Sequence, residues 1–241
     1  AGAWWCTVRA ARLPRRWSRL LTAGIAAATA LVPAVLPLAW SQPRSALRPW
    51  TWTAYTWMGL LFYLVLFGLA ARLVAWAWGR RGSAATDPDR RLFLQRASAA
   101  AAAVGASTVS AWGLRAASEL VVEEVEVPLR RLPPELDGFR IVQISDLHLG
   151  PLDGSAFLER VVQRCNALRP DLVAITGDVV DGPVDRIAAD VAPLRSLRST
   201  HGSFLVTGNH EYYSGVAAWL AEFERLGVRT LGNERVAIAA D

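Results

Sequence analysis

The chain has 241 residues, of which 53% are hydrophobic, and it carries 26 basic residues, 21 acidic residues and two cysteines. This composition excludes a disordered chain, a collagen-like repeat and a disulfide-bonded scaffold. The charge is uneven: residues 1–114 hold 13 arginines and two aspartates, whereas residues 115–241 hold 13 arginines and 19 acidic residues. The acidic excess of the second part argues against a nucleic-acid partner, and we expect the two parts to lie in different environments.

Two long runs without a charged residue lie near the start of the chain. Residues 20–43 form a run of 24 and residues 49–71 a run of 23. As helices rising about 1.5 Å per residue, both could cross a hydrocarbon layer of about 30 Å. Trp50, Trp52 and Trp57 lie at one end of the second run, where aromatic rings favour the membrane interface. We predict two transmembrane helices; the alternative is a pair of core helices in a soluble protein.

A third uncharged run, residues 97–114, has 18 residues rich in alanine and serine, which is the lower limit for a span. Five arginines precede the first run, two separate the first two runs, and six lie between the second and the third. The positive-inside rule therefore places the N-terminal flank and residues 72–96 in the cytoplasm. If the third run also crosses, the rest of the chain lies outside; if it does not, the rest faces the cytoplasm.

A pair of arginines precedes the third run directly. Arg90 and Arg91 begin the sequence Arg-Arg-Leu-Phe-Leu, which looks like a twin-arginine export signal. The alternative is an arginine-rich cytoplasmic loop, because the chain contains no lysine and has other arginine pairs. Both interpretations favour export of the residues after 114. We therefore expect residues 1–114 to be a membrane region with about three transmembrane helices, at 20–43, 49–71 and 97–114.

Residues 115–138 are predicted to be a connector that contains a first strand. Residues 120–127 alternate in part between valine and glutamate, which is typical of a half-buried strand. Pro133, Pro134 and Gly138 then indicate a stiff turn before the next apolar run.

From residue 139 onward a strand, a polar loop and a helix alternate three times. Strands are predicted at 139–145, 171–176 and 204–207, and helices at 155–168, 184–197 and 216–226, with Pro193 interrupting the second helix. Such alternation predicts a largely parallel α/β sheet, with a site beyond the carboxyl ends of its strands. The apolar residues 236–240 look like a further, unfinished strand.

Polar side chains follow each of these three strands. Asp146 and His148 come after the first, Asp178 after the second, and Asn209 after the third. Neighbouring parallel strands would bring these side chains together, and oxygen and imidazole donors suit a pair of divalent cations. Taken singly, an aspartate could instead cap a helix, and Asn209 could occupy a left-handed turn. Three clusters in order favour the metal interpretation.

These clusters resemble the motifs of the calcineurin-like metallophosphoesterase superfamily, in particular its bacterial membrane-anchored branch. The matching segments are Asp-Leu-His at 146–148, Gly-Asp-Val-Val-Asp at 177–181 and Gly-Asn-His-Glu at 208–211. The resemblance implies an α/β fold in which transmembrane helices precede a calcineurin-like αββα sandwich, with mixed sheets flanked by helices. Residues 139–241 would be the N-terminal part of that domain, so the sandwich would be incomplete.

The resemblance also implies roles for individual residues. Asp146 and His148 would bind a first metal ion, Asp178 would bridge two ions, and Asn209 would bind the second; the ions could be Mn, Fe, Zn or Mg. A water activated by both ions would hydrolyse a phosphomonoester, phosphodiester or pyrophosphate bond. His210 would act at the leaving oxygen as a proton donor or a charge stabiliser, and Asp181 would fix its tautomer.

Two departures from the family pattern limit these expectations. The chain has only three histidines, whereas the family takes further histidine ligands from its second half, so we expect a fragment cut at both ends, with weak activity or none. The alternative function is a non-catalytic membrane-anchored module that binds a metal or a ligand. Gly182 stands where phosphoprotein phosphatases have an arginine, which favours a phosphorylated small molecule or a lipid-linked substrate over a protein. We expect the protein in the bacterial cell membrane, with its catalytic domain outside.

Overall fold

The computed structural model of the chain describes residues 14–39, 44–79, 88–150, 152 and 154–238. The chain forms two compact units, Ala1–Glu119 and Leu120–Asp241. Each unit has a hydrophobic cluster of its own.

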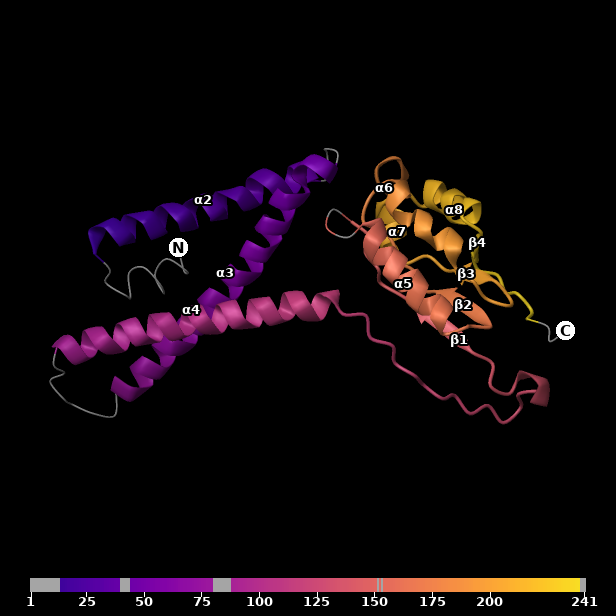
Figure 1. The fold of residues 1–241 in the computed structure, drawn as a ribbon, viewed down its shortest axis with the longest axis horizontal. Helices are drawn as coiled ribbons and strands as arrows, with labels where there is room; N and C mark the ends of the chain where they lie inside the picture. Colours follow the sequence, from indigo (N-terminus) through magenta and orange to yellow (C-terminus); the bar gives the residue numbers. More distant parts are fainter. Residues whose placement is uncertain (1–13, 40–43, 80–87, 151, 153, 239–241) are drawn as a thin grey trace. The chain divides into compact units, whose positions relative to one another are not determined.

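The first unit consists of three long helices. They are α2 (Arg15–Ala39), α3 (Arg44–Gly79) and α4 (Pro88–Ser118), and α3 contacts both of the others (Figure 1). Each helix begins ahead of the uncharged run predicted for it, because a helix can continue through flanking arginines. Residues 40–43 of the first predicted span lie outside the described residues. Arg90 and Arg91 lie in the first turn of α4, and their role as an export signal stays a prediction.

All three helices are long and apolar enough to cross a membrane. In each, no more than 17% of the most apolar 18-residue window is buried within the protein, so most of the apolar surface faces outward. The hydroxyl groups of Thr51, Thr53 and Ser98 donate hydrogen bonds to carbonyls four residues earlier, at 2.8–3.0 Å. Such internal bonding satisfies polar side chains where water is absent. The first unit is therefore suited to a lipid environment.

A small residue allows α4 to pack closely on α3. A Cβ atom at Gly105 would lie 3.6 Å from the ring of Phe67, which is ordinary van der Waals contact. Next to it, Ala106 is fully buried and Leu64 nearly so. Glycine and alanine at helix contacts are typical of membrane proteins, where packing replaces the hydrophobic effect as the driving force.

The strand predicted in the connector is wrong. The backbone of residues 119–129 forms neither helix nor strand, and the side chains of Val121 and Val125 are 86% and 73% exposed. A strand needs a neighbouring strand to pair its backbone groups, and no segment of the described chain pairs with this one. The predicted turn ahead of the sheet contains a short 3₁₀ helix, η2 (Pro134–Leu136).

The second unit contains the parallel sheet that the sequence predicts. Its strands are β1 (Ile141–Ile144), β2 (Leu172–Ile175), β3 (Ser203–Leu205) and β4 (Val228–Thr230), in the order β1-β2-β3-β4, and every neighbouring pair is parallel. The first three correspond to the predicted strands: β1 and β2 are shorter at both ends, and β3 begins one residue earlier and ends two residues earlier than predicted. The fourth is too short to be recognised in the sequence. Residues 236–238, the described part of the last predicted strand, are irregular.

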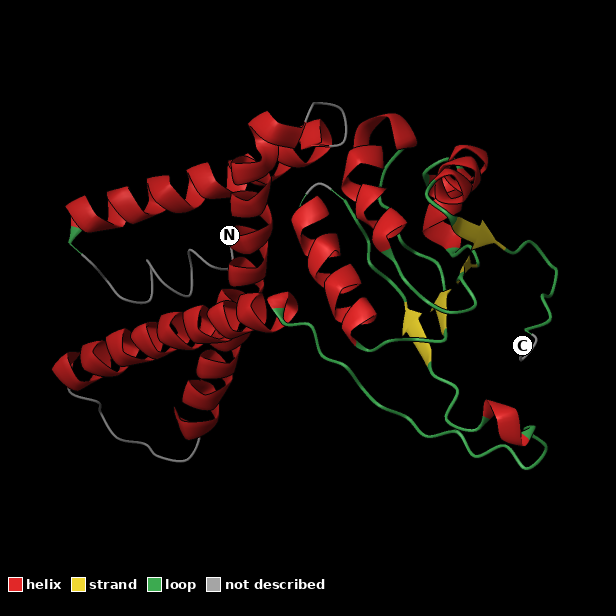
Figure 2. Ribbon diagram, turned by 45° about the vertical axis from the view of Figure 1, so that its right-hand side comes forward, coloured by secondary structure: helices red, strands yellow, loops and turns green. Residues whose placement is uncertain are grey.

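Helices connect the strands (Figure 2). They are α5 (Ser155–Ala167), α6 (Val184–Val191), α7 (Asn209–Tyr213) and α8 (Val216–Arg225), and the predicted interruption at Pro193 appears as a 3₁₀ segment, η3 (Ala192–Ser196). Proline lacks the N–H that an α-helix requires, so α6 ends just before it. The core combines Val173, Ile175 and Leu205 of the sheet with residues of α5, α6 and α8. On the other face Ile141 is 59% exposed, so the described helices cover one face of the sheet.

Together the two units are three long apolar helices and a parallel α/β domain, which agrees with the predicted fold class.

Candidate metal centre

The loops that follow β1 and β2 run side by side and bond to each other. The N–H groups of His148 and Leu149 donate to the carbonyls of Asp178 and Val179 at 2.9 and 2.8 Å, and the N–H of Asp181 donates back to Leu149 at 2.8 Å. These bonds continue the parallel pairing beyond the ends of the strands. The two predicted polar clusters are therefore held against each other by the backbone.

Side chains along these loops divide between the core and the site. Leu149, Val179 and Val180 are fully buried and belong to the hydrophobic core. The polar residues of the same loops keep partial exposure: the side chain of His148 is 37% exposed and that of Asp181 is 21% exposed. Burial of the apolar residues thus fixes the loops, and the loops present the polar groups at the sheet edge.

Three of the predicted ligands have an uncommon backbone conformation. Asp146, His148 and Asp178 have φ angles of 54°, 44° and 50°, in the left-handed region that residues with a side chain seldom adopt. Such strain is concentrated at functional sites. Neither Asp146 nor Asp178 caps the helix that follows it, because α5 and α6 begin after Gly154 and Pro183. Asp178 instead accepts a hydrogen bond from the first turn of α7, and Asn209 is not among the residues with positive φ.

The structure brings Asp146, His148 and Asp178 together. Each offers one donor atom, and the three atoms lie within 4.8 Å of one another. The Nε2 atom of His148 lies 3.9 Å from Oδ1 of Asp146. Two carboxylates and an imidazole suit Mn, Fe or Zn, so this set fits a divalent cation.

Asn209 meets Asp178 from the third strand end. One terminal atom of its side-chain amide lies 3.1 Å from Oδ2 and 3.3 Å from Oδ1 of Asp178. If the amide nitrogen occupies this position it donates to the carboxylate; a half-turn brings the amide oxygen there, where a shared cation would hold both groups. The N–H of His210 also donates to Oδ1 of Asp178 at 2.8 Å. Asp178 is therefore common to all three loops.

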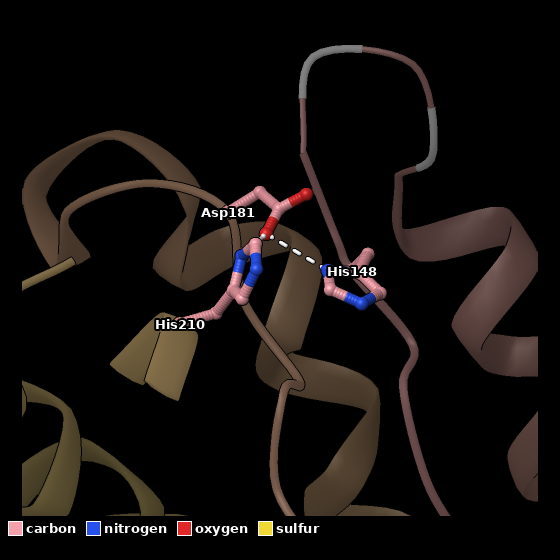
Figure 3. A group of neighbouring side chains, drawn as sticks. All are labelled: His148, Asp181 and His210. Carbon is pink, nitrogen blue, oxygen red and sulfur yellow. Dashed lines mark hydrogen bonds and ion pairs between the residues drawn. The ribbon is translucent and has the colours of Figure 1, made fainter. Parts of the chain in front are cut away.

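A single carboxylate oxygen holds two histidines. Oδ1 of Asp181 lies 3.1 Å from Nδ1 of His148 and 2.5 Å from Nδ1 of His210 (Figure 3). The two imidazole rings meet edge to face, with centroids 4.4 Å apart. Because a carboxylate can only accept, both Nδ1 atoms carry the hydrogen, and both Nε2 atoms remain free. The predicted pairing of Asp181 with His210 is present, and the contact with His148 is an addition to it.

The carboxylates around His148 change its proton affinity. Burial alone would lower the pKa of the ring, but the hydrogen bond to Asp181 and the charges of Asp181, Asp178 and Asp146 raise it, and the net pKa lies above the ordinary value. Below this raised pKa the ring carries a proton that a cation must displace.

Two glycines make the close approach of the loops feasible. Gly177 has a φ of 84°, and a Cβ atom there would overlap the backbone of Gly208. A Cβ at Gly208 would overlap the carboxylate of Asp178. Only glycine fits both places, because it has no side chain, and at Gly177 it also accepts the positive φ.

Glu211 joins two of the loops, and its sequence position does not indicate this role. Its carboxylate is fully buried and accepts hydrogen bonds from the N–H groups of Asp178, Val179 and Gly208, at 3.0, 2.7 and 2.7 Å. The bond to Gly208 is the reciprocal half of a capping box, with Gly208 as N-cap of α7. A glutamate three residues after an N-cap is a recognisable sequence signal, but its partners 32 and 33 residues earlier are not.

Replacement of Glu211 by alanine should destabilise the second unit by about 3 kcal/mol, because three backbone N–H groups lose their acceptor at about 1 kcal/mol each. The measurement is thiol labelling of Cys165 against urea concentration at pH 8 in a Cys6→Ser background. Cys165 is buried, and burial raises the pKa of its thiol to about 11, so labelling reports unfolding. Glu159→Ala, an exposed glutamate of α5, is the control and should stay within about 0.5 kcal/mol. An unchanged midpoint for Glu211→Ala would contradict the role given to this carboxylate.

His201 lies apart from the other two histidines. It precedes β3, at the amino end of the sheet, and its ring packs on Phe139 with centroids 5.4 Å apart. It therefore adds no donor to the site.

These features define a parallel α/β domain with a candidate metal centre at the carboxyl edge of its sheet. Residues 139–238 match the family described as calcineurin-like phosphoesterase. Residues 139–238 therefore belong to a calcineurin-like metallophosphoesterase domain, and members of this family generally depend on metal ions.

Relatives come from animals and bacteria. A "Transmembrane protein with metallophosphoesterase domain" of Bos taurus is 42% identical over 195 residues, which cover 78% of this chain and 43% of that protein. Its counterpart in Danio rerio is 35% identical over 184 residues, covering 74% of this chain and 40% of that protein. An uncharacterized metallophosphoesterase of Helicobacter pylori (strain ATCC 700392 / 26695) is 37% identical over 115 residues, covering 48% and 30%.

The chain thus spans about two-fifths of the length of the two transmembrane relatives. No solved structure gives a significant match. The two relatives named as transmembrane proteins and the three apolar helices support association with a membrane. Relatives occur in vertebrates as well as in bacteria, so the likeness is not specific to the predicted bacterial branch.

Proposed function

We propose that this chain carries the membrane anchor and the metal-binding loops of a metal-dependent phosphoesterase that hydrolyses a phosphomonoester, phosphodiester or pyrophosphate bond. The observation that supports this function is the convergence of three strand-end loops on one place. Carboxylate, imidazole and amide donors meet there, next to a histidine that a carboxylate orients.

Each predicted ligand has a place in this proposal. Asp146, His148 and Asp178 would hold one cation, and Asp178 together with Asn209 would hold a second. Two divalent cations bound there would neutralise charge on the phosphate and lower the pKa of a water molecule that attacks it. Asp181 keeps Nε2 of His148 available as a ligand, as carboxylate partners of ligating histidines do.

His210 would act on the leaving group. Its Nδ1–H is donated to Asp181, so Nε2 is the atom that can hold a proton and release it to the departing oxygen. The side chain is 34% exposed, which leaves it accessible to a substrate. Asp181 stabilises the charged ring while the proton is held there.

The test is hydrolysis of small phosphoesters by the full-length protein in detergent, measured as release of phosphate from monoesters or pyrophosphate and as release of the alcohol from diesters. We expect release to require a divalent cation such as Mn²⁺, to stop on chelation, and to return when the cation is restored. A protein that binds Mn²⁺ but releases neither phosphate from monoesters or pyrophosphate nor an alcohol from diesters would be a binding module instead, and the proposal would fail.

The anchor suggests where the substrate is found. Helices α2, α3 and α4 would keep the second unit at the bilayer, which favours a phosphorylated small molecule or a lipid-linked substrate. With α4 as a third span and arginine-rich cytoplasmic flanks, the second unit would lie outside the cytoplasm.

Reporter fusions test this orientation. Alkaline phosphatase fused after residue 120 should be active, because it folds only after export, whereas a fluorescent protein fused there should stay dark. Fusions after residue 85, in the arginine-rich loop between the second and third predicted spans, serve as the control and should give the opposite pattern. Fluorescence without phosphatase activity at residue 120 would place the second unit in the cytoplasm.

A further inference from the structure

The short helix α7 carries two exposed aromatic residues next to the candidate metal centre. It begins with Asn209 and His210 and ends with Tyr212 and Tyr213, which are 63% and 79% exposed. Residues three apart on a helix lie on the same side. Accordingly, the ring of Tyr213 meets that of His210 edge to face, with centroids 5.7 Å apart at 66°.

Other aromatic rings of the second unit are buried in its core. Trp219 and Phe223 of the neighbouring helix α8 are both fully buried and stack at 5.4 Å. Tyr213 is left outside this core, and its hydroxyl makes no hydrogen bond to any residue described in the structure. A ring that is open to solvent beside a polar site offers an apolar face to whatever occupies that site.

The surroundings of His210 determine which part of a substrate would meet this ring. Nδ1 of His210 is held by Asp181, and the ring of His148 packs against it at 4.4 Å. Tyr213 also contacts this imidazole, and at 79% exposure it is more exposed than Asp181 or His148. A group bonded to the oxygen that His210 protonates would therefore extend past Tyr213.

We propose that Tyr213 is a specificity-determining residue that binds an apolar or planar group attached to the leaving oxygen of the substrate. The inference rests on the proposed function and adds a substrate class to it: phosphoesters whose alcohol part is aromatic or hydrocarbon close to the ester oxygen. Tyr213 contributes the face of its ring, so phenylalanine can replace it and alanine cannot.

The test compares two phosphonates that are not hydrolysed, benzylphosphonate and ethylphosphonate, by calorimetric titration of the full-length protein with Mn²⁺ present. The wild-type protein should bind benzylphosphonate about five- to tenfold more tightly, as a single aromatic contact allows. Tyr213→Ala should remove this preference without changing the affinity for ethylphosphonate, and Tyr213→Phe should keep it. Tyr212→Ala is the matched control and should also keep it.

The inference is overturned if the wild-type protein does not prefer benzylphosphonate, including the case in which neither compound binds. It is also overturned if Tyr213→Ala lowers the affinity for both compounds equally, because the ring would then support the structure of the whole site and not one part of the ligand. Hydrolysis of benzyl and ethyl phosphate separates this inference from the proposed function. Selective binding of benzylphosphonate without hydrolysis would contradict the proposed function and support the role of Tyr213. Hydrolysis without a preference for the benzyl compounds would support the proposed function and contradict the role of Tyr213.

Discussion

Asp178→Asn is expected to lower kcat/KM for phosphate release by about three orders of magnitude, which corresponds to about 4 kcal/mol of transition-state stabilisation. Asp178 faces Asp146 and His148 on one side and Asn209 on the other, so it is the one side chain that both proposed cations share. Asparagine has the same shape and can still accept the 2.8 Å hydrogen bond from the N–H of His210. The loss should therefore arise from charge and not from misfolding.

Titration with Mn²⁺ separates these causes. Asp178→Asn should bind the cation much more weakly, while thiol labelling of Cys165 against urea shows an almost unchanged midpoint. Asp185→Asn is the matched control, because Asp185 is an exposed aspartate in the first turn of α6, and it should behave as wild type. If Asp178→Asn retained full turnover and full Mn²⁺ affinity, the proposed centre would be in the wrong place.

His210→Ala should slow turnover by about 10²- to 10⁴-fold, the usual contribution of a general acid or base, with little change in Mn²⁺ affinity. Its imidazole is not part of the group formed by Asp146, His148 and Asp178, although its donor atom lies within 4.8 Å of those of His148 and Asp181 in a second group. Its backbone N–H, which alanine keeps, is what contacts Asp178. The loss should be larger for ethyl phosphate than for p-nitrophenyl phosphate, because an alkoxide needs a proton on departure and a nitrophenolate does not.

The control for this variant is His201→Ala, at the opposite end of the sheet, which should leave both turnover and Mn²⁺ affinity nearly unchanged. Equal loss for the two substrates would show that His210 stabilises charge without delivering a proton. Full activity of His210→Ala on both would remove it from the mechanism.

The sequence predicts those parts of the fold that depend on local patterns of apolar and polar residues. Strands and helices after residue 139 are recognisable because apolar runs alternate with polar loops, and the clusters at 146–148, 178 and 209 come directly after strand ends. Parallel pairing then brings them together without further information. The strand expected at residues 120–127 shows the limit of such patterns, since alternation specifies a two-faced segment, and only a neighbouring strand makes it part of a sheet.

Contacts between residues far apart in the chain are the part that sequence patterns do not predict. The buried carboxylate of Glu211 bonds to backbone groups 32 and 33 residues away, and nothing near position 211 indicates those partners. Likewise, β4 has three residues and exists because β3 offers it an edge. The positive φ angles of Asp146, His148 and Asp178 occur where the loops bond to each other, at residue types that adopt positive φ more readily than most others with a side chain.

The oxygen of Asp181 that holds both imidazoles has a consequence for genetics. This one carboxylate positions both His148, the proposed metal ligand, and His210, the proposed proton donor. A natural variant that moves the carboxylate would therefore disturb metal binding and proton transfer together. We expect substitutions of Asp181 to abolish turnover, and second substitutions that reposition only one of the two histidines should fail to restore it.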